Sequence, residues 1–515
     1  DYSFLATYTY HNYKGYREHS EDYWHILNTV LETTPGKNTN LQFLGYFTTG
    51  LIRLPGSLTK REYDADPFQA AKREKDFDYR RISKKGRVGL RLNSKFGETL
   101  NNEVEITTYG TIKYFERTQR NYRIFNRYGL GGSARFTNKS ILFDDRENEI
   151  SFGGDLFYQT GPIEDYNNIN GKKGDLLNSL TDETIGNSGV FIQNMFELYG
   201  KKLYLLLSGR YDNVYFDQKD QLLASRNDIK RYEAFTPKAA LNYKITPSVA
   251  VYTSYGLSFD SPAGNELDNY PLSSNGGSTL INPDLKPQKS KNFELGIKGN
   301  IIDFDRKYFI NSYFELTFFN SIIEDEIVPF EVYGDVYYRN SAQTTRTGIE
   351  FGGRTEIVEG LRFILSYTYS NFKYDKYSAI SIDTDSLGNI VSDPQDFSGN
   401  LVPSVPEHNL TTALEYEHHF NYNLIGFIKS SVQYVSGLYV NDANSEKTED
   451  YALLGTTLGI DYRIGKINIL LSGGLNNILD KRYVGFVNIN STSGRFYEAG
   501  EPRTFFASLH LGYTF

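Results

Sequence analysis

The chain ends in a strict two-residue alternation that runs through its last eleven residues, 505–515. Successive side chains of a β-strand point to opposite faces of the sheet, so this segment predicts a strand with one apolar face. The same period recurs over residues 203–212, 309–319, 361–370 and 408–417. This repetition predicts an all-β protein, and both a soluble β-sandwich and a transmembrane β-barrel would satisfy it. The apolar face of the last strand would hold Phe505, Ala507, Leu509, Leu511, Tyr513 and Phe515.

The connections between these strands distinguish the two folds, because they alternate in length. Short turns lie at residues 199–201, 246–247, 358–360 and 463–466. Long excursions span residues 49–84, 257–291, 371–406, 436–450 and 479–504. Long loops at one rim and short turns at the other are typical of outer-membrane barrels. We therefore predict a large transmembrane antiparallel β-barrel of about twenty strands, whose lumen is too wide for side chains to fill.

The composition excludes several other classes of protein. No run approaches the ~18 consecutive apolar residues that a membrane-spanning helix needs, and the mean hydropathy is −0.49. The chain has no cysteine, which excludes disulfides and thiolate metal sites. Its net charge of −8 at pH 7 argues against nucleic acid as a partner. No motif brings a nucleophile and a base together, so we predict that the protein is not an enzyme.

Several segments of the chain resemble those of one protein family. They are residues 15–20, 282–296 and 403–410, and the last loop and strand at 476–483 and 496–506. On these segments the chain resembles the TonB-dependent outer-membrane transporters, although Gln288 stands where the family pattern usually has Glu. The matching positions are Asn282, Pro283, Leu285, Pro287, Asp480, Arg482, Tyr483, Gly500, Glu501, Pro502 and Arg503, and Phe515 resembles the terminal aromatic residue that serves the family as an assembly signal.

The resemblance implies a complete barrel of about 22 strands, filled by an N-terminal plug domain that follows a TonB box. Residues 1–515 would then form the barrel without the plug and without its first two strands, because residues 2–11 align with the third strand of the family. The chain would be either part of a longer protein or a truncated homologue. The first explanation is favoured, since an unpaired strand edge in lipid is costly.

The resemblance also implies a function. Members of this family bind a scarce solute outside the cell and import it with energy delivered through TonB. We therefore expect a receptor in the bacterial outer membrane for a ferric chelate, such as a ferric siderophore or ferric citrate. No cofactor is expected, because the iron chelate is the transported substrate. Two alternatives remain open: a passive porin-like channel, and the barrel subunit of a surface complex.

The same resemblance names the expected partners. They are the small-molecule iron chelate, the TonB complex through the plug, and the lipid and lipopolysaccharide of the outer membrane. A surface lipoprotein would be a further partner if the barrel belongs to a surface complex.

An anionic chelate requires cationic donors and aromatic walls, and arginine is favoured for bidentate contacts with carboxylates. The excursion at 49–84 supplies Arg80 and Arg81, and the loop at 15–20 supplies Arg17 and His19. Alternatively, these side chains face solvent, or the arginines bind lipopolysaccharide phosphates. The seven histidines show no ligand spacing, so no metal site is predicted. A second predicted excursion would place Arg117, Arg120, Tyr122, Arg123 and Arg127 at the ligand.

Overall fold

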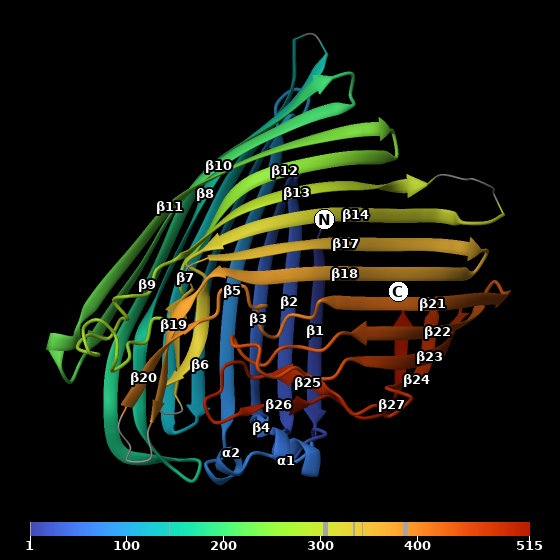
Figure 1. The fold of residues 1–515 in the computed structure, drawn as a ribbon. Coiled ribbons are helices and arrows are strands. Elements are labelled where there is room, and N and C mark those ends of the chain that lie inside the picture. The colour runs from blue at the N-terminus through green and yellow to red at the C-terminus, as the bar shows by residue number, and fades with distance from the viewer. Residues whose placement is uncertain (1, 144, 302–306, 333–334, 342, 385–389) are drawn as a thin grey trace.

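The computed structural model describes residues 2–143, 145–301, 307–332, 335–341, 343–384 and 390–515. Twenty of its strands form one antiparallel sheet, in which each strand pairs with the next one along the chain (Figure 1). These strands are β1 (Tyr2–Tyr13), β2 (Asp22–Gly36), β3 (Thr39–Arg53), β5 (Arg80–Phe96), β6 (Asn102–Thr118), β7 (Asn121–Leu142), β8 (Arg146–Ile169), β9 (Lys172–Tyr199), β10 (Leu203–Asp220), β11 (Asp228–Thr246), β12 (Val249–Asp260), β13 (Gln288–Ile301), β14 (Ile310–Glu324), β17 (Gln343–Val358), β18 (Leu361–Lys376), β21 (His408–Asn421), β22 (Leu424–Val435), β23 (Tyr451–Ile464), β24 (Ile467–Asn476) and β27 (Thr504–Tyr513).

Short elements lie within the connections of this sheet. The hairpin of β15 and β16 interrupts the connection from β14 to β17, and the hairpin of β19 and β20 interrupts the one from β18 to β21. Strands β4, β25 and β26 form a small separate sheet. The bounds are β4 (Leu58–Thr59), α1 (Lys60–Ala65), α2 (Lys72–Asp76), η1 (Ala224–Arg226), β15 (Ile327–Val332), β16 (Asp335–Asn340), β19 (Ser378–Thr384), β20 (Ile390–Asp396), β25 (Val484–Val487) and β26 (Arg495–Ala499).

The large antiparallel sheet confirms the predicted fold class, and the predicted short turns connect its strands. Two-residue connections such as Gly465–Lys466 join the strands at one end of the sheet. The long connections, with α1, α2 and the small sheet, gather at the other end, which lies at the left and bottom of Figure 1. Among the described residues, no helix is long and apolar enough to cross a membrane.

One prediction about the connections is wrong. Residues 117–127 do not form a long loop, because β6 and β7 continue through them and only Gln119 and Arg120 form the turn. The neighbouring strands β8 and β9 reach 24 and 28 residues. About ten residues are enough to cross a bilayer, so these strands extend well beyond the membrane at the end that bears the long connections.

The outer surface of the sheet is apolar, as the alternation of the last strand predicts. Leu509 of β27 is 61% exposed, and its cross-strand partner on β24 is Leu471. Leu130 on β7 is likewise 63% exposed. So much exposed apolar surface is unfavourable in water, whereas it suits contact with the hydrocarbon of a membrane.

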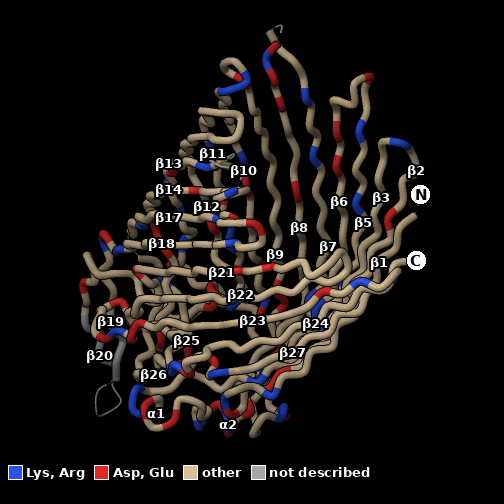
Figure 2. The backbone as a smooth tube through the Cα atoms, turned by 90° about the vertical axis from the view of Figure 1, so that its right-hand side faces the viewer, with Lys and Arg blue, Asp and Glu red and all other residues tan. Residues whose placement is uncertain are grey.

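The sheet has two edges. Strand β1 pairs with β2, strand β27 pairs with β24, and no ladder joins β1 to β27 within the part of the chain that the structure describes. Both termini lie at the right-hand side of the view in Figure 2. The open backbone groups of β1 and β27 are therefore available to other strands.

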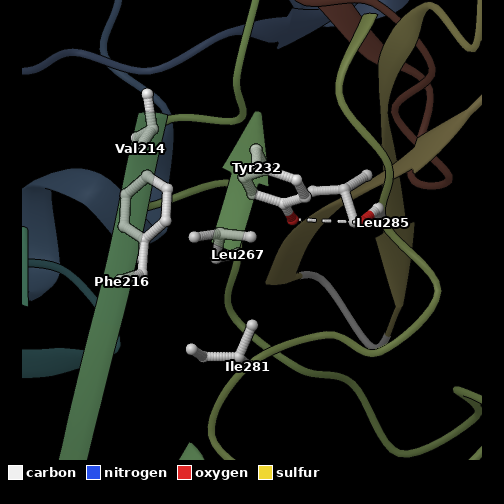
Figure 3. Packing of buried hydrophobic residues seen from close by; sticks show 6 residues of the cluster. All are labelled: Val214, Phe216, Tyr232, Leu267, Ile281 and Leu285. Atoms are coloured by element: carbon white, nitrogen blue, oxygen red, sulfur yellow. Dashed lines mark hydrogen bonds between the residues drawn. The ribbon is translucent and has the colours of Figure 1, made fainter. Parts of the chain in front are cut away.

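A small apolar core fastens the long connection at 261–287 to the wall of the barrel (Figure 3). Leu267 and Ile281 of this connection are fully buried, and Leu285 is 1% exposed. They pack against side chains of β10 and β11, and the Tyr232 hydroxyl donates a hydrogen bond to the Leu285 carbonyl oxygen at 3.1 Å. The core thereby fixes where the connection lies over the mouth of the barrel.

Candidate functional site

A cavity of about 820 Å³ lies at the end of the barrel that bears the long connections. One wall is formed by the ends of β5, β6 and β7 that lie beside the long connections. The connection at 261–287 and the strand β16 form other parts of the lining. Four of the predicted residues, Arg81, Arg117, Arg123 and Arg127, project into it, and Arg120 lines it from the β6–β7 turn.

The strand register explains why these arginines come together. Arg81 on β5 lies opposite Arg117 on β6, which in turn lies opposite Arg123 on β7. Side chains two residues apart share a face of the sheet. A second cationic row, Lys85, Lys113 and Arg127, therefore lies four residues further into the barrel on the same face.

Three of these five predicted arginines form ion pairs. The Arg123 guanidinium lies 3.0 Å from an Asp165 carboxylate oxygen and 3.6 Å from one of Asp268. Arg127 pairs with Glu183. Arg120 pairs with Asp335 of β16 at 3.2 Å and so links the β6–β7 turn to the covering hairpin. These pairs order the wall of the cavity and neutralise much of its charge.

Arg81 and Arg117 differ from their neighbours in having no carboxylate within 4.0 Å among the described residues. The Arg117 Nε is also buried without a hydrogen-bond partner. An unpaired guanidinium in a partly desolvated position is costly unless a ligand supplies the missing acceptor. Arg81 and Arg117 therefore offer free hydrogen-bond donors to an anion that enters the cavity.

Asp268 places a titratable carboxyl group beside these arginines. The Asp268 side chain is partly exposed to the cavity. The surrounding protein still desolvates its carboxyl group, and this desolvation raises the pKa of Asp268 above that of a free aspartate. Arg123 and Arg117 oppose the shift by favouring the charged form. Protonation of Asp268 would remove one negative charge from the cavity and weaken its ion pair with Arg123, which stays paired with Asp165.

Aromatic rings separate the two cationic rows. Phe115 and Phe125 lie opposite each other on β6 and β7, with their ring centroids 5.4 Å apart. The guanidinium carbons of Arg127 and Arg123 lie 5.4 and 6.0 Å from the Phe125 ring centroid. Such contacts hold a cation in place without neutralising it.

Two of the predicted ligand residues lie on the wrong face of the sheet. Arg80 and Tyr122 point away from the cavity because each is one residue out of phase with the inward-facing positions. Arg80 pairs with Asp78 and donates to the Gly171 carbonyl oxygen at 3.0 Å. The Tyr122 hydroxyl donates to Glu116. Their contacts order the outer surface of the hairpins.

The loop at residues 15–20 also has a structural role, because its predicted ligand residues contact other loops. Arg17 is 5% exposed and donates to the carbonyl oxygens of Gly56 and Gln69 at 2.7 and 3.0 Å, and it pairs with Glu498 at 3.3 Å. His19 lies 3.2 Å from the Tyr79 carbonyl oxygen, and burial lowers its pKa. Neither side chain lines the cavity.

The motif at 282–287 positions the connection that carries Asp268. The buried Asn282 donates from its amide to the Tyr338 carbonyl oxygen at 3.2 Å, and its backbone nitrogen donates to Leu267 at 2.8 Å. The Pro283 carbonyl oxygen accepts from Lys230 at 2.8 Å. Leu285 fills the apolar core, and Pro287 precedes the first residue of β13.

The motif residues near the C-terminus likewise pack one loop against another. A Cβ atom on Gly500 would lie 2.1 Å from the Tyr483 ring, so only glycine fits there. The Arg503 backbone nitrogen donates to Asp480 at 3.0 Å. Glu501 accepts from the Tyr13 hydroxyl at 3.3 Å, Arg482 and Pro502 line a small hollow beside Tyr483, and Phe515 is fully exposed at the end of the chain.

Several cavity residues were not predicted from the sequence. Phe125, which lines the cavity, and its cross-strand partner Phe115 could have been found by extending the two-residue period through residues 113–127. Asp165 and Glu183 carry no local signal, since they face the arginines only through the register of β8 and β9. Tyr337 and Tyr338 also line the cavity and come from the β15–β16 hairpin.

Comparison with known proteins agrees with this architecture. The chain is 25% identical over 355 residues to the ferrioxamine B receptor of Salmonella typhimurium (strain SL1344), an alignment that covers 68% of this chain and 44% of that receptor. It is 25% identical over 279 residues to the catecholate siderophore receptor Fiu of Escherichia coli (strain K12), covering 53% of this chain and 32% of the receptor. The chain thus spans less than half the length of these relatives.

Solved structures share the fold. The ferric citrate transporter FecA in its unliganded form superimposes with a TM-score of 0.77 at 17% identity, covering 99% of this chain and 73% of that one. The siderophore receptor PiuA from Acinetobacter baumannii gives a TM-score of 0.77 at 14% identity, covering 99% and 77%. The family model for the TonB dependent receptor-like beta-barrel matches residues 4–478. The chain therefore belongs to the TonB-dependent receptor β-barrel family, whose members are outer-membrane transporters and receptors rather than enzymes.

Proposed function

We propose that this chain is the barrel of an outer-membrane receptor that binds an anionic ferric chelate in the mouth cavity and imports it with energy from TonB. The observation that carries the proposal is the pair of unpaired guanidiniums, Arg81 and Arg117, which lie opposite each other beside the ion-paired Arg123 and Arg127. The relatives named for ferric siderophores support the choice of an iron chelate. The tyrosines of β16 give the chelate an aromatic wall opposite the arginines.

The chemistry of the cavity favours one group of chelates. Carboxylate and catecholate oxygens of an iron complex carry negative charge and accept hydrogen bonds, so a planar guanidinium can bind two of them at once. Ferrioxamine B has a pendant ammonium group that would meet the unpaired guanidiniums unfavourably. We therefore propose citrate-type or catecholate-type ferric complexes as the ligand class.

The receptor would need two further parts. The free edges of β1 and β27 would be closed by two strands outside this chain, which would remove the unpaired backbone groups from lipid. A plug domain would fill the lumen and connect the receptor to the TonB complex. The lengths of the relatives leave room for both parts.

The outer surface suggests the remaining partners. The apolar band would contact outer-membrane lipid. Above it, Lys84 faces outward with its ammonium 5.7 Å from the Tyr114 ring centroid, and Arg80 lies on the same face. Lys84 would bind lipopolysaccharide phosphates, since Arg80 is already paired with Asp78. A surface lipoprotein would be an additional partner on the same rim.

Equilibrium binding to the full receptor in outer-membrane vesicles tests the proposal. The probes are iron-55 complexes of citrate and of 2,3-dihydroxybenzoate, with iron-55 ferrioxamine B for comparison. At least one anionic complex should bind better than ferrioxamine B, and the R81Q/R117Q variant should weaken it about tenfold or more. The outward-facing K84Q control should stay within about twofold. Preference for ferrioxamine B, or full affinity in R81Q/R117Q, would overturn the proposal.

A further inference from the structure

Positive charge continues from the mouth cavity into the barrel along one wall. The inward-facing positions of β5 carry Arg81, Lys85 and Arg87, and those of β6 carry Arg117 and Lys113. We call these five residues the basic track. Six residues of extended strand separate Arg81 from Arg87, so the track is about 20 Å long. Only the end of the track formed by Arg81 and Arg117 lines the cavity.

The basic track has no internal neutralisation. None of its five side chains has a carboxylate within 4.0 Å among the described residues. Lys85 and Lys113 lie directly opposite each other, and like charges in that position are destabilising. Neighbouring cations differ from the track in having carboxylate partners: Arg127 pairs with Glu183, and Arg91 pairs with Glu105.

Aromatic rings hold the track in place. The Lys113 ammonium lies 5.1 Å from the Phe115 ring centroid, and the Arg87 guanidinium carbon lies 5.6 Å from that of Tyr109. These contacts orient the cations and leave their positive charge free to act on a solute in the lumen. A low-dielectric wall lined by one sign of charge raises the local concentration of the opposite ion.

The geometry points to a second role for this wall: the basic track is a transit site that binds the anionic chelate after it leaves the mouth cavity and guides it along β5 and β6 into the lumen. This inference rests on the proposed function. Lys85, Lys113 and Arg87 are its new binding residues, and the ligand class is a multivalent anion. The chelate would pass from one row of cations to the next without meeting a fixed carboxylate on these two strands until Glu105.

A bromide soak tests the track independently of the transported ligand. Crystals of the full receptor in sodium bromide should show an anomalous peak at the Lys85 and Lys113 ammonium groups. The peak should be absent from K85Q/K113Q crystals. If plug carboxylates occupy the track instead, or if no bromide binds there in the wild type, the cations serve the packing of the receptor and the inference is overturned.

Transport measurements give the functional consequence. K85Q/K113Q cells should bind the anionic chelate at the surface within about twofold of wild type but import it about tenfold more slowly. K85R/K113R should restore import, because it keeps both charges. The matched control is K298Q on β13, whose ammonium lies 5.1 Å from the Tyr252 ring centroid on another part of the sheet. If K85Q/K113Q cells import the chelate at the wild-type rate, the inference about the basic track is overturned. Surface binding by R81Q/R117Q tests only the proposed function of the mouth cavity.

Discussion

At the scale of single residues, neighbouring arginines of the mouth cavity have different roles. Arg123 is held between Asp165 and Asp268, while Arg117, directly opposite on the next strand, has no carboxylate partner among the described residues. The ion-paired guanidinium stiffens the wall, and the unpaired one keeps its donors for a ligand. Electrostatic repulsion within the row makes a bound anion more favourable than water.

Asp268 predicts a specific pH dependence. Burial raises its pKa, so Asp268 takes up a proton at a higher pH than a free aspartate does. Protonation makes the cavity more positive, and affinity for an anionic chelate should therefore rise as the pH falls. Binding isotherms at several pH values would measure the effect.

The D268N variant is the control for that prediction. The variant lacks the titrating carboxyl group. The affinity of the D268N receptor for the chelate should therefore vary with pH only as far as the chelate itself titrates. At the upper pH it should bind more tightly than wild type, because it lacks the negative charge. An unchanged pH profile in D268N would show that Asp268 is not the responsible group.

At the scale of elements, the connection at 261–287 depends on its apolar core. Leu285→Ala should leave a cavity beneath the connection and destabilise its docking by about 2–5 kcal/mol. Because Asp268 lies on the same connection, this part of the cavity lining should become more mobile as well. Hydrogen exchange of residues 261–287 should accelerate, and limited proteolysis should cut there first.

Leu272→Ala provides a matched control within the same connection. Leu272 is 39% exposed and lies outside the core, so this change removes the same atoms with little effect on docking. If residues 261–287 show equal hydrogen-exchange rates in the two variants, the apolar core does not hold the connection in place.

The elements also show how far the sequence determines the structure. The two-residue period and the alternating connection lengths predicted the sheet, its strand count and the end at which the site lies, because both signals are local. The boundary at residues 117–127 was missed because these strands extend beyond the membrane, where nothing requires an apolar outer face. Arg80 and Arg81 are adjacent, and only the strand phase decides that Arg81 faces the cavity.

The remaining site residues depend on long-range register. Asp165, Glu183 and Asp268 meet the arginines across strands and loops that are far apart in sequence. The resemblance identified the residues around Asn282 and Gly500, but it could not separate ligand contacts from loop packing. Their buried contacts assign them to packing.

At the scale of the whole molecule, the last strand has to insert and pair correctly. Phe515 is fully exposed, and its ring centroid lies 5.1 Å from that of Tyr513. Deleting Phe515 should lower the amount of receptor in the outer membrane, because the resemblance to the family assigns this aromatic residue to recognition by the insertion machinery. The affinity of the inserted receptor should not change, since Phe515 does not line the cavity.

Quantitative immunoblots of membrane fractions, with chelate binding per inserted receptor, would measure both effects. Phe143→Ala is the control, because Phe143 is 78% exposed in the short turn between β7 and β8. A lower affinity per inserted receptor after deletion of Phe515 would contradict the assigned role.

We propose that the mouth cavity binds an anionic ferric chelate through Arg81 and Arg117. The most direct measurement is anomalous diffraction at the iron edge from crystals of the full receptor soaked with the anionic complex that binds best. We predict an iron peak inside the cavity, with ligand oxygens in hydrogen-bond contact with both guanidiniums. An iron peak outside the cavity, or one inside it that contacts neither Arg81 nor Arg117, would contradict the account.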